Sequence, residues 1–227
     1  MNQKTVNPDL LANFHAPKFP GSYFISLEGI EGAGKSCQII RLKNYLEERK
    51  FRVLLVREPG GTVFGEKLRQ AILEGKTPLH PVAEAALFAA SRAQLLHEVI
   101  LKELANPQTI IICDRYIDSG LSYQGFARKL GLPYLLNIHN CYPLNLFPHL
   151  TLLIEIDLAT SYQRQKKRNA SKDYFESQND QFYRDLIEGY KEIAKLFPQR
   201  IFTVDGLKDE VTVFASIKKR VDQLLLT

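Results

Sequence analysis

The octapeptide GIEGAGKS, which begins at Gly29, constrains this chain more than any other feature of its sequence. It matches the pattern G-x-x-x-x-G-K-[ST] and lies between an apolar stretch and an amphipathic one. In that setting the glycines let successive backbone N–H groups face one point, at which the following helix aims its positive end. The motif therefore predicts a loop that binds the phosphates of a nucleotide such as ATP. Its predicted contacts are Gly29, Ile30, Glu31, Gly32, Ala33, Gly34, Lys35 and Ser36.

Two side chains of the loop and one carboxylate beyond it are candidates for phosphate and metal binding. The ammonium group of Lys35 can reach the β- and γ-phosphates, and the hydroxyl of Ser36 can ligate Mg²⁺. Asp114 ends the apolar stretch TIIIC, and in P-loop enzymes a strand-end aspartate lies beside the metal. On its own, such an aspartate could equally initiate a turn. Arg115 follows at once and can offset phosphate charge in the same cleft.

Strand-like apolar stretches alternate with helix-length amphipathic stretches along the chain. We expect strands at residues 23–28, 52–56, 109–113, 150–156 and 201–204. We expect helices at residues 35–48, 65–73, 81–105, 160–167 and 210–225. This alternation predicts an α/β protein of three layers, α/β/α, with helices on both faces of a five-stranded parallel sheet. Together with the loop motif it indicates the P-loop NTPase fold.

Residues 22–227 contain neither an internal repeat nor a linker, so we expect a single domain there. Residues 1–21 hold three prolines and no sustained hydrophobic period. We expect them to form a flexible N-terminal extension, draped on the surface or disordered.

The composition bounds the compartment and the partners. The three cysteines are odd in number and lack CxxC spacing, which favours free thiols in a reducing compartment. No apolar run approaches the roughly 18 residues that span a bilayer, and no signal-peptide pattern opens the chain, so we expect a cytoplasmic protein. The net charge of +5 is compatible with nucleic acid or with anionic small molecules. No long basic tract gathers that charge, but charge alone does not separate a polyphosphate substrate from nucleic acid. From the other features of the sequence we expect neither a nucleic-acid nor a membrane partner.

Several arginines indicate a second anionic substrate. Phosphoryl transfer depends on positioning and on positive charge, so arginines around the cleft would hold the acceptor. Arg57 follows the second expected strand, and Arg92 lies on an apolar helix four residues after Phe88, on the same face. A ring beside a guanidinium suits a planar base with a polar edge. Taken singly, each arginine could instead be solvated, and Phe88 could belong to the core.

Five segments, in this order, resemble the thymidylate kinase family. They are FISLEGIEGAGKS (24–36), REPGGT (57–62), FAASRAQ (88–94), DRY (114–116) and SGLSYQG (119–125). The likeness covers essentially everything after Gly21, and REPGGT and the YQG that follows DRY are its specific parts. It implies a homodimeric P-loop nucleoside monophosphate kinase that transfers the γ-phosphoryl group of ATP to dTMP. The products would be ADP and dTDP, on the route to dTTP.

The resemblance also implies roles for individual residues. Phe88 would stack on the thymine ring and Arg92 would bond its edge, while Arg115 and Arg57 would hold the acceptor monophosphate. Tyr123 would crowd the sugar 2′ position, and Gln124 would line the base pocket. Glu31 would lie near the acceptor phosphate and the metal. The long helix that carries Phe88 would form part of the dimer interface.

The additional catalytic cation is expected in a mobile lid, at about residues 163–178. Some family members carry an arginine inside the phosphate-binding loop, whereas this loop reads Glu31-Gly32-Ala33. We therefore expect the lid to supply the charge, with Arg168 as the candidate. The same basic stretch could simply be a solvated helix end.

Two departures from the family pattern keep other functions open. Family lids commonly read D-R-x-E, whereas this chain has Tyr174 in place of the arginine, and Gly120 replaces a Ser or Asn that contacts the base. The alternatives are a kinase for another deoxynucleoside monophosphate, and a nucleotide-binding or nucleic-acid-binding protein of impaired catalysis.

Overall fold

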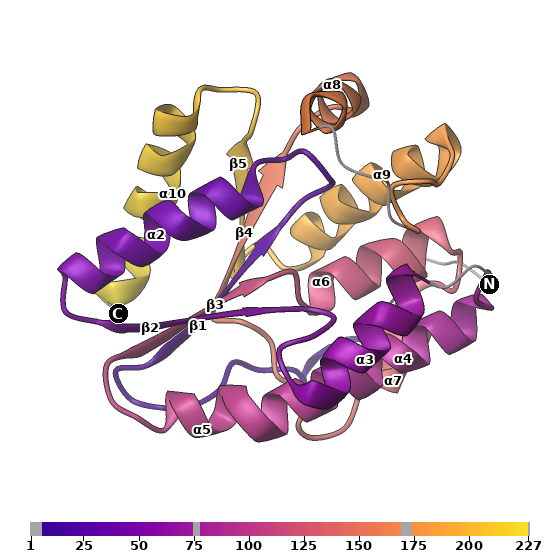
Figure 1. Cartoon of the computed structure of the whole chain (residues 1–227). Helices are drawn as coiled ribbons and strands as arrows, with labels where there is room; N and C mark the ends of the chain where they lie inside the picture. The colour runs from indigo at the N-terminus through magenta and orange to yellow at the C-terminus, as the bar shows by residue number, and fades with distance from the viewer. Residues whose placement is uncertain (1–5, 75–77, 169–173, 227) are drawn as a thin grey trace.

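A single parallel sheet forms the centre of the molecule in the computed structural model, which describes residues 6–74, 78–168 and 174–226 (Figure 1). Its strands are β1 (Tyr23–Glu28), β2 (Arg52–Arg57), β3 (Thr109–Asp114), β4 (Leu150–Glu155) and β5 (Ile201–Asp205), in the spatial order β2-β3-β1-β4-β5. Every neighbouring pair runs parallel. The five predicted strands and the parallel sheet are thus confirmed.

Helices cover both faces of the sheet, which completes the three layers (Figure 1). Helix α2 (Lys35–Glu48) packs against α10 (Glu210–Leu225) on one face. A second set of helices lies on the other face. These are α3 (Val63–Leu73), α4 (Pro81–Leu95), η1 (Leu96–Ile100), α5 (Leu101–Leu104), α6 (Ile117–Gly120), η2 (Leu121–Ala127), α7 (Leu132–Ile138) and α9 (Asp180–Leu196). Helix α8 (Leu158–Arg168) lies above the carboxyl ends of β4 and β5.

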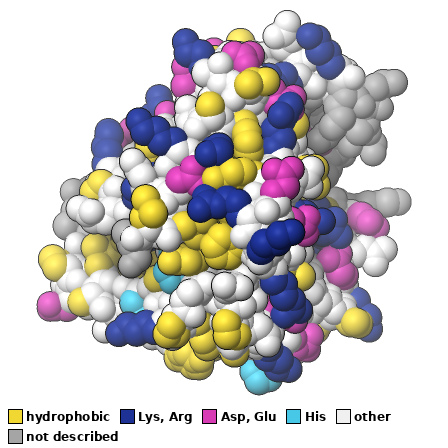
Figure 2. Space-filling model, turned by 90° about the vertical axis from the view of Figure 1, so that its left-hand side faces the viewer, with side chains coloured by type: hydrophobic (Ala, Val, Ile, Leu, Met, Phe, Trp, Pro, Cys, Tyr) yellow, Lys and Arg dark blue, Asp and Glu magenta, His cyan; other side chains and the backbone are white. Residues whose placement is uncertain are grey.

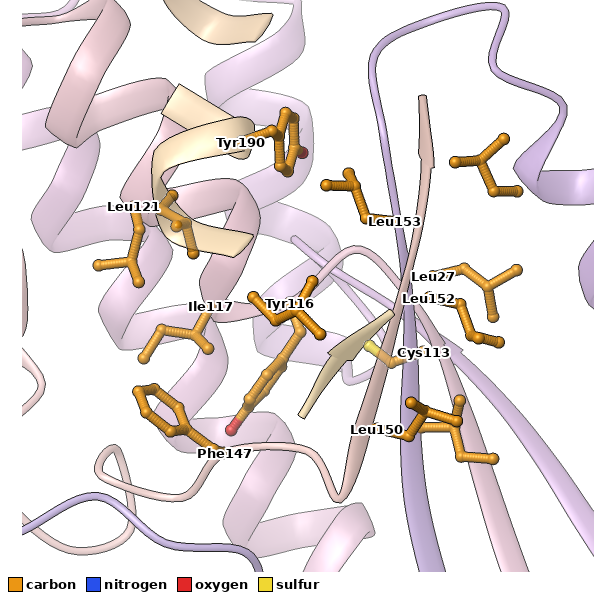
Figure 3. Packing of buried hydrophobic residues seen from close by; sticks show 14 of the residues in the cluster. Leu27, Cys113, Tyr116, Ile117, Leu121, Phe147, Leu150, Leu152, Leu153 and Tyr190 are labelled. Atoms are coloured by element: carbon orange, nitrogen blue, oxygen red, sulfur yellow. The ribbon is translucent and has the colours of Figure 1, made fainter. Parts of the chain in front are cut away.

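The central strands are apolar on both sides because helices cover both sides. Five of the six residues of β3 and five of the six of β4 are buried. Leu27 of β1 pairs with Leu152 of β4, and both side chains lie on one side of the strands, whereas Tyr116 and Tyr190 lie on the other (Figure 3). Burial of this kind makes the strand ends rigid, and the site is built on those ends.

The helices of the described residues differ from the sequence-based expectation in one interruption and in five helices that were not predicted: α1 (Pro8–Leu11), α6, η2, α7 and α9. The predicted helix 81–105 is interrupted by the π-helical turn η1, between α4 and α5. Helix α9 was not predicted, although its buried residues Phe182, Leu186, Tyr190 and Ile193 recur at helical spacing. Its N-cap is Asn179, whose side chain accepts from the N–H of Phe182.

The N-terminal segment packs onto the loop that precedes β4. Phe14 is buried, and its ring stacks on that of Phe147 with 4.8 Å between centroids. The N–H of Phe147 donates to the carbonyl oxygen of His15 at 2.9 Å. Residues 6–21 therefore lie on the surface of the sheet domain, and the flexibility of residues 1–21 stays a prediction. Across the described part of the chain, no helix combines the length and apolarity that a bilayer crossing requires.

Candidate active site

The phosphate-binding loop connects β1 to α2 and is pressed against the neighbouring strand β4. Gly29 has a φ of 137°, and a Cβ atom there would lie 2.4 Å from the carbonyl oxygen of Ile154. Only glycine tolerates both conditions. The hydroxyl of Ser161 in α8 donates to the carbonyl oxygen of Glu31 at 2.6 Å, which ties the loop to the helix above it. The loop ends at the N-terminus of the 14-residue helix α2, the arrangement that binds phosphate.

Lys35 is buried inside the loop. Its ammonium group donates to the carbonyl oxygens of Gly29 at 2.9 Å and Ile30 at 3.3 Å. Burial, together with the nearby guanidinium of Arg115, lowers the pKa of Lys35 to about 8. A phosphate group bound in the loop would favour the charged ammonium and would raise this pKa again. The side chain is therefore placed to respond to an anion.

Arg115 connects the loop to the residues beyond β3. Its guanidinium donates to the carbonyl oxygen of Gly29 at 2.9 Å and to Glu31 Oε1 at 2.7 Å. The hydroxyl of Tyr123 donates to the same Glu31 oxygen at 2.7 Å. Burial raises the pKa of the Glu31 carboxyl, but Arg115, Lys35 and the Tyr123 hydrogen bond outweigh that effect, so the pKa lies below its usual value. An ionised carboxylate thus lies between the loop and Arg115.

Two buried carboxylate oxygens have no hydrogen-bond partner within the described residues: Glu31 Oε2 and Asp114 Oδ1. Asp114 ends β3, and Ser36 begins α2 with an exposed side chain. Carboxylate and hydroxyl oxygens suit Mg²⁺, which usually keeps several waters and takes only one or two protein ligands beside substrate phosphates. Within the described residues, no three His, Cys, Asp or Glu side chains cluster in a way that could hold a metal ion by themselves. Ser36 and Asp114 therefore fit a magnesium ion that the substrate helps to hold.

A small pocket of about 70 Å³ opens beside Arg115. It is lined by Glu31, Glu58, Pro59, Arg69, Leu73, Phe88, Arg115, Ser119, Gly120, Tyr123, Gln124 and Phe175. Five of the predicted site residues, from four of the family-like segments, are thus brought together around one space: Glu31, Phe88, Arg115, Tyr123 and Gln124. Aromatic and polar side chains converge there, as in sites for a planar polar ligand.

Two predicted arginines do not line this pocket. The guanidinium of Arg57 is 54% exposed and donates to Glu66 at 2.9 Å. Arg92 is buried and pairs with Glu58, with its Nε 2.9 Å from Oε2. Its Nη1 also lies 2.6 Å from Nε2 of His139. Burial and the positive charge of Arg92 lower the pKa of His139 to about 3, so this imidazole is neutral and accepts the hydrogen bond.

A second cavity, of about 990 Å³, lies between the ends of β4 and β5 and helices α8 and α9. It reaches the loop at Gly29 and Ile30, and its walls combine apolar and charged side chains such as Ile187, Arg184 and Asp180. None of the predicted acceptor residues lines it. The predicted acceptor residue Arg115 lines the smaller pocket instead and also contacts the phosphate-binding loop.

Three comparisons with known proteins agree with this geometry. The family model described as Thymidylate kinase matches residues 27–217. The thymidylate kinase of Acholeplasma laidlawii is 44% identical over 185 residues, which are 81% of this chain and 90% of that protein. The thymidylate kinase of Caldanaerobacter subterraneus subsp. tengcongensis is 38% identical over 202 residues, or 89% and 96% of the two chains. The chain belongs to the thymidylate kinase family.

A solved relative extends the likeness to three dimensions. The crystal structure of thymidylate kinase from Ehrlichia chaffeensis matches with a TM-score of 0.71 at 29% identity, covering 89% of this chain and 99% of that one. The family resemblance of the sequence and the P-loop fold are thereby confirmed. So is the expected class of enzyme, a phosphotransferase.

The two departures from the thymidylate kinase pattern now have structural surroundings. The hydroxyl of Tyr174, which replaces the lid arginine, accepts from Arg128 at 2.9 Å, and the guanidinium lies 5.3 Å from its ring centroid. Gly120 lines the pocket, and a Cβ atom there would lie 3.6 Å from Gln124 Oε1, an ordinary contact distance. The side chain of Arg168, the predicted lid cation, lies outside the described residues, as do residues 169–173.

Sequence reasoning missed several residues that hold the site together. Glu28 is buried directly before the loop and accepts from the N–H of Tyr116 at 2.7 Å and from the hydroxyls of Ser119 at 2.6 Å and Tyr190 at 3.0 Å. Burial, and then the charge of Asp118, raise the pKa of Glu28 to about 7. An acidic residue at the end of an otherwise apolar strand was the only signal for it in the sequence.

Arg164 of α8 is a second such residue. It donates to the carbonyl oxygens of Gly32 at 3.1 Å and Gly206 at 2.9 Å, and so joins the phosphate-binding loop to the segment after β5. It belongs to the basic stretch that was predicted to form the lid, but only the fold reveals its partners.

Proposed function

We propose that this member of the thymidylate kinase family transfers the γ-phosphoryl group of ATP to dTMP, giving ADP and dTDP. The strongest support for this proposal is one observation. Arg115 and Glu31 touch both the phosphate-binding loop and the aromatic pocket, so two nucleotides bound in these places would meet at the same guanidinium. A P-loop protein with no second substrate has no use for such a pocket.

Transfer would depend on charge and alignment. The loop N–H groups and Lys35 would hold the β- and γ-phosphates of ATP, and Arg115 would hold the monophosphate of dTMP in line with the γ-phosphorus. Because the acceptor phosphate is already ionised, the reaction needs no general base. Ser36 and Asp114 would hold Mg²⁺, which neutralises charge on the transferring phosphates. Glu31 would lie beside the acceptor phosphate and help to orient Arg115.

The remaining predicted residues would bind the nucleoside. Phe88 would stack on the base, Tyr123 would limit the space at the sugar 2′ position, and Gln124 and Arg92 would face the edge of the base. Arg57 would join Arg115 at the monophosphate after releasing Glu66, an exposed partner that holds it weakly. The cation of the lid would come from Arg168, which closes over the phosphates.

The pocket must widen when dTMP enters. Its volume of about 70 Å³ is well below the roughly 300–1,000 Å³ of typical ligand sites. Phe175 is the side chain whose movement would open it, because its ring lies 6.1 Å from that of Phe88 and 5.2 Å from that of Tyr123. Since Phe175 follows the predicted lid tip directly, lid movement and pocket opening would be coupled.

We propose a homodimer that buries the surface of α3, α4 and α7. Large apolar side chains are exposed on these three helices, namely Val63, Phe64, Val82 and Tyr134. Exposed apolar surface of this kind favours association with a second copy. On the face shown in Figure 2, Lys and Arg side chains mix with acidic and apolar ones, so this face gives no support to a nucleic-acid partner. Three free thiols, at Cys37, Cys113 and Cys141, favour the reducing environment of the cytoplasm.

A coupled assay of ADP release tests the reaction. With ATP and Mg²⁺ present, dTMP should give the highest kcat/KM among dTMP, dUMP, dCMP and dGMP. Turnover that favours a purine or cytidine monophosphate would contradict the proposed acceptor. Binding of ATP without any turnover would contradict the proposed reaction as a whole.

A further inference from the structure

We propose that Glu84 is a positioning residue that sets base specificity, by fixing the side-chain amide of Gln124 with its carbonyl oxygen toward the base pocket. The inference rests on the proposed function, since it takes the pocket of Gln124 to be the site of the base. It concerns Glu84, which lies on α4 behind Gln124 and does not line the pocket.

The first step is the direction of the Gln124 amide. Its Nε2 donates to Glu84 Oε1 at 2.7 Å, and both side chains are fully buried. A carboxylate accepts hydrogen bonds and cannot donate them. The amide nitrogen must therefore face Glu84, and the amide oxygen must face away from it. This orientation follows from the chemistry of the partner and not from the naming of two similar atoms.

The second step is the ion pair that holds the Glu84 side chain in place. A buried charge is costly unless it is paired, and Arg128 pairs with Glu84 at 3.2 Å between Nη2 and Oε2. Arg128 is itself held by the hydroxyl of Tyr174 at 2.9 Å and by the ring of Phe182, whose centroid lies 4.8 Å from the guanidinium carbon. The orientation of the amide is thus anchored, through Arg128, to Tyr174 and to Phe182 on α9.

The third step is what the pocket then presents. Arg92 does not line the pocket, but a Cβ atom on Gly120, which does, would lie 3.6 Å from Gln124 Oε1 and 3.8 Å from Arg92 Nη1. Both atoms therefore lie beside the space at Gly120. One is an acceptor and the other a donor. Thymine and uracil carry the complementary pair, an N3–H donor beside the O4 acceptor. Cytosine carries the reverse, an unprotonated N3 beside an amino group.

The pair formed by Gln124 Oε1 and Arg92 Nη1 matters more in this chain because Gly120 stands where the family pattern has Ser or Asn. A serine or asparagine there would add a hydroxyl or amide that can donate or accept, whereas glycine adds nothing. Discrimination against cytosine therefore falls on Gln124 and Arg92. When a polar pocket meets a base of the wrong pattern, its buried groups are left unpaired, and such mismatches lower kcat/KM by orders of magnitude. The 5-methyl group lies outside this pair, so the pair does not separate dTMP from dUMP.

The central test is Glu84→Gln in the full chain. A glutamine at this position can accept or donate, so it lets the Gln124 amide turn over. We expect the ratio of kcat/KM for dTMP over dCMP to fall at least about tenfold, while the ratio for dTMP over dUMP changes less than twofold. Glu84→Asp keeps an acceptor-only group and should retain most of the discrimination. Glu98→Gln makes the same exchange at an exposed residue of η1, the turn that follows α4, and should leave both ratios unchanged.

The alternatives give different results. If dTMP, dUMP and dCMP lose activity in parallel in Glu84→Gln, then Glu84 only supports the fold and the inference is overturned. An unchanged dTMP:dCMP ratio in a variant of normal melting temperature overturns it as well. If Glu84→Gln does not fold, the wild-type enzyme still decides, because 3-methyl-dTMP cannot donate from N3. Tight binding of that analogue would overturn the inference, and its exclusion would support it. Failure of the wild type to phosphorylate any pyrimidine monophosphate would instead refute the proposed function.

Discussion

Arg115 has a left-handed backbone, with a φ of 67°, and its neighbours explain how that strain is tolerated. A residue other than glycine in this region is held there by its surroundings. The N–H of Arg115 donates to the carbonyl oxygen of Leu27, and the N–H of Tyr116 donates to the buried carboxyl of Glu28. These bonds turn the chain sharply at the end of β3 and bring the guanidinium back over the phosphate-binding loop.

The first prediction concerns the acceptor contact of Arg115. Arg115→Ala should raise the KM for dTMP by about 10–100-fold, because it removes charge-assisted hydrogen bonds to the monophosphate. The KM for ATP should change much less. Steady-state kinetics with each substrate varied in turn will measure both, and Lys43→Ala, which removes a half-buried cation of α2 that pairs with Glu47, serves as the control. Equal effects on the two KM values would refute the acceptor role.

The second prediction concerns the buried carboxyl of Glu28. Its pKa is raised from 4.5 to about 7 by burial and by Asp118, so the folded chain holds this proton more tightly than the unfolded chain does. The stability from that proton is present at low pH and is lost as the pH rises through about 7. A shift of this size corresponds to about 3 kcal/mol when complete.

Glu28→Gln removes this titration. We expect the free energy of unfolding of the variant, relative to wild type, to rise by about 2–3 kcal/mol between pH 5 and pH 8. Urea denaturation at several pH values will measure the difference. Glu47→Gln, on an exposed turn of α2, should show no such trend. A difference that stays constant with pH would show that Glu28 does not titrate in this range.

At the scale of elements, the sequence was most informative where one local rule was sufficient. The strand Thr109–Asp114 could be predicted because a strand covered on both faces is apolar throughout, and α2 because the loop motif requires a helix after it. Helix α9 was not predicted, although its apolar residues recur at helical spacing. The basic stretch before it is typical of a lid, and that interpretation covered the residues up to 178, just before the helix begins.

The partners of the site residues were beyond prediction, since they are far apart in the sequence. Arg92 meets Glu58 across 34 residues, and Gln124 meets Glu84 across 40. Five of the predicted site residues line one pocket, because the carboxyl ends of parallel strands meet at one edge of a sheet. Arg57 and Arg92 are each paired with a carboxylate. Such pairing depends on the fold, and no local sequence pattern predicts it.

The third prediction belongs to the N-terminal segment. Phe14→Ala should lower the free energy of unfolding by about 1–3 kcal/mol, because it uncovers the ring of Phe147 at the edge of the core. The kcat should not change, since neither ring lines the pocket. Thermal denaturation and the coupled assay measure the two quantities. Tyr142→Ala, which truncates an exposed ring in the same loop, should change stability by less than about 0.5 kcal/mol. Equal losses in the two variants would mean that the segment does not stabilise the domain.

At the scale of the whole molecule, the two faces of the sheet expose apolar side chains differently. On the face away from α2 and α10, the exposed apolar residues belong to three helices that lie close together, α3, α4 and α7. Phe64 on α3 is 45% exposed and Val63 beside it is 79% exposed. Such side chains in contact with water cost free energy, and a second copy of the chain could cover them through a two-fold axis.

The last prediction tests this surface with one charge. Phe64→Asp should shift the protein from dimer to monomer at micromolar concentration, because a two-fold interface receives the buried charge twice. The loss comes from desolvation of the two introduced carboxylates, whatever cations such as Lys67 lie on the same helix. Sedimentation equilibrium measures the change. The matched control is Val211→Asp on α10, a similarly exposed apolar residue on the opposite face of the sheet, which should stay dimeric. The helix that carries Phe64 also carries Arg69 and Leu73 of the acceptor pocket, so the monomer should bind dTMP less tightly than the dimer does. A dimer that survives Phe64→Asp would place the interface elsewhere and would separate dimerisation from the acceptor site.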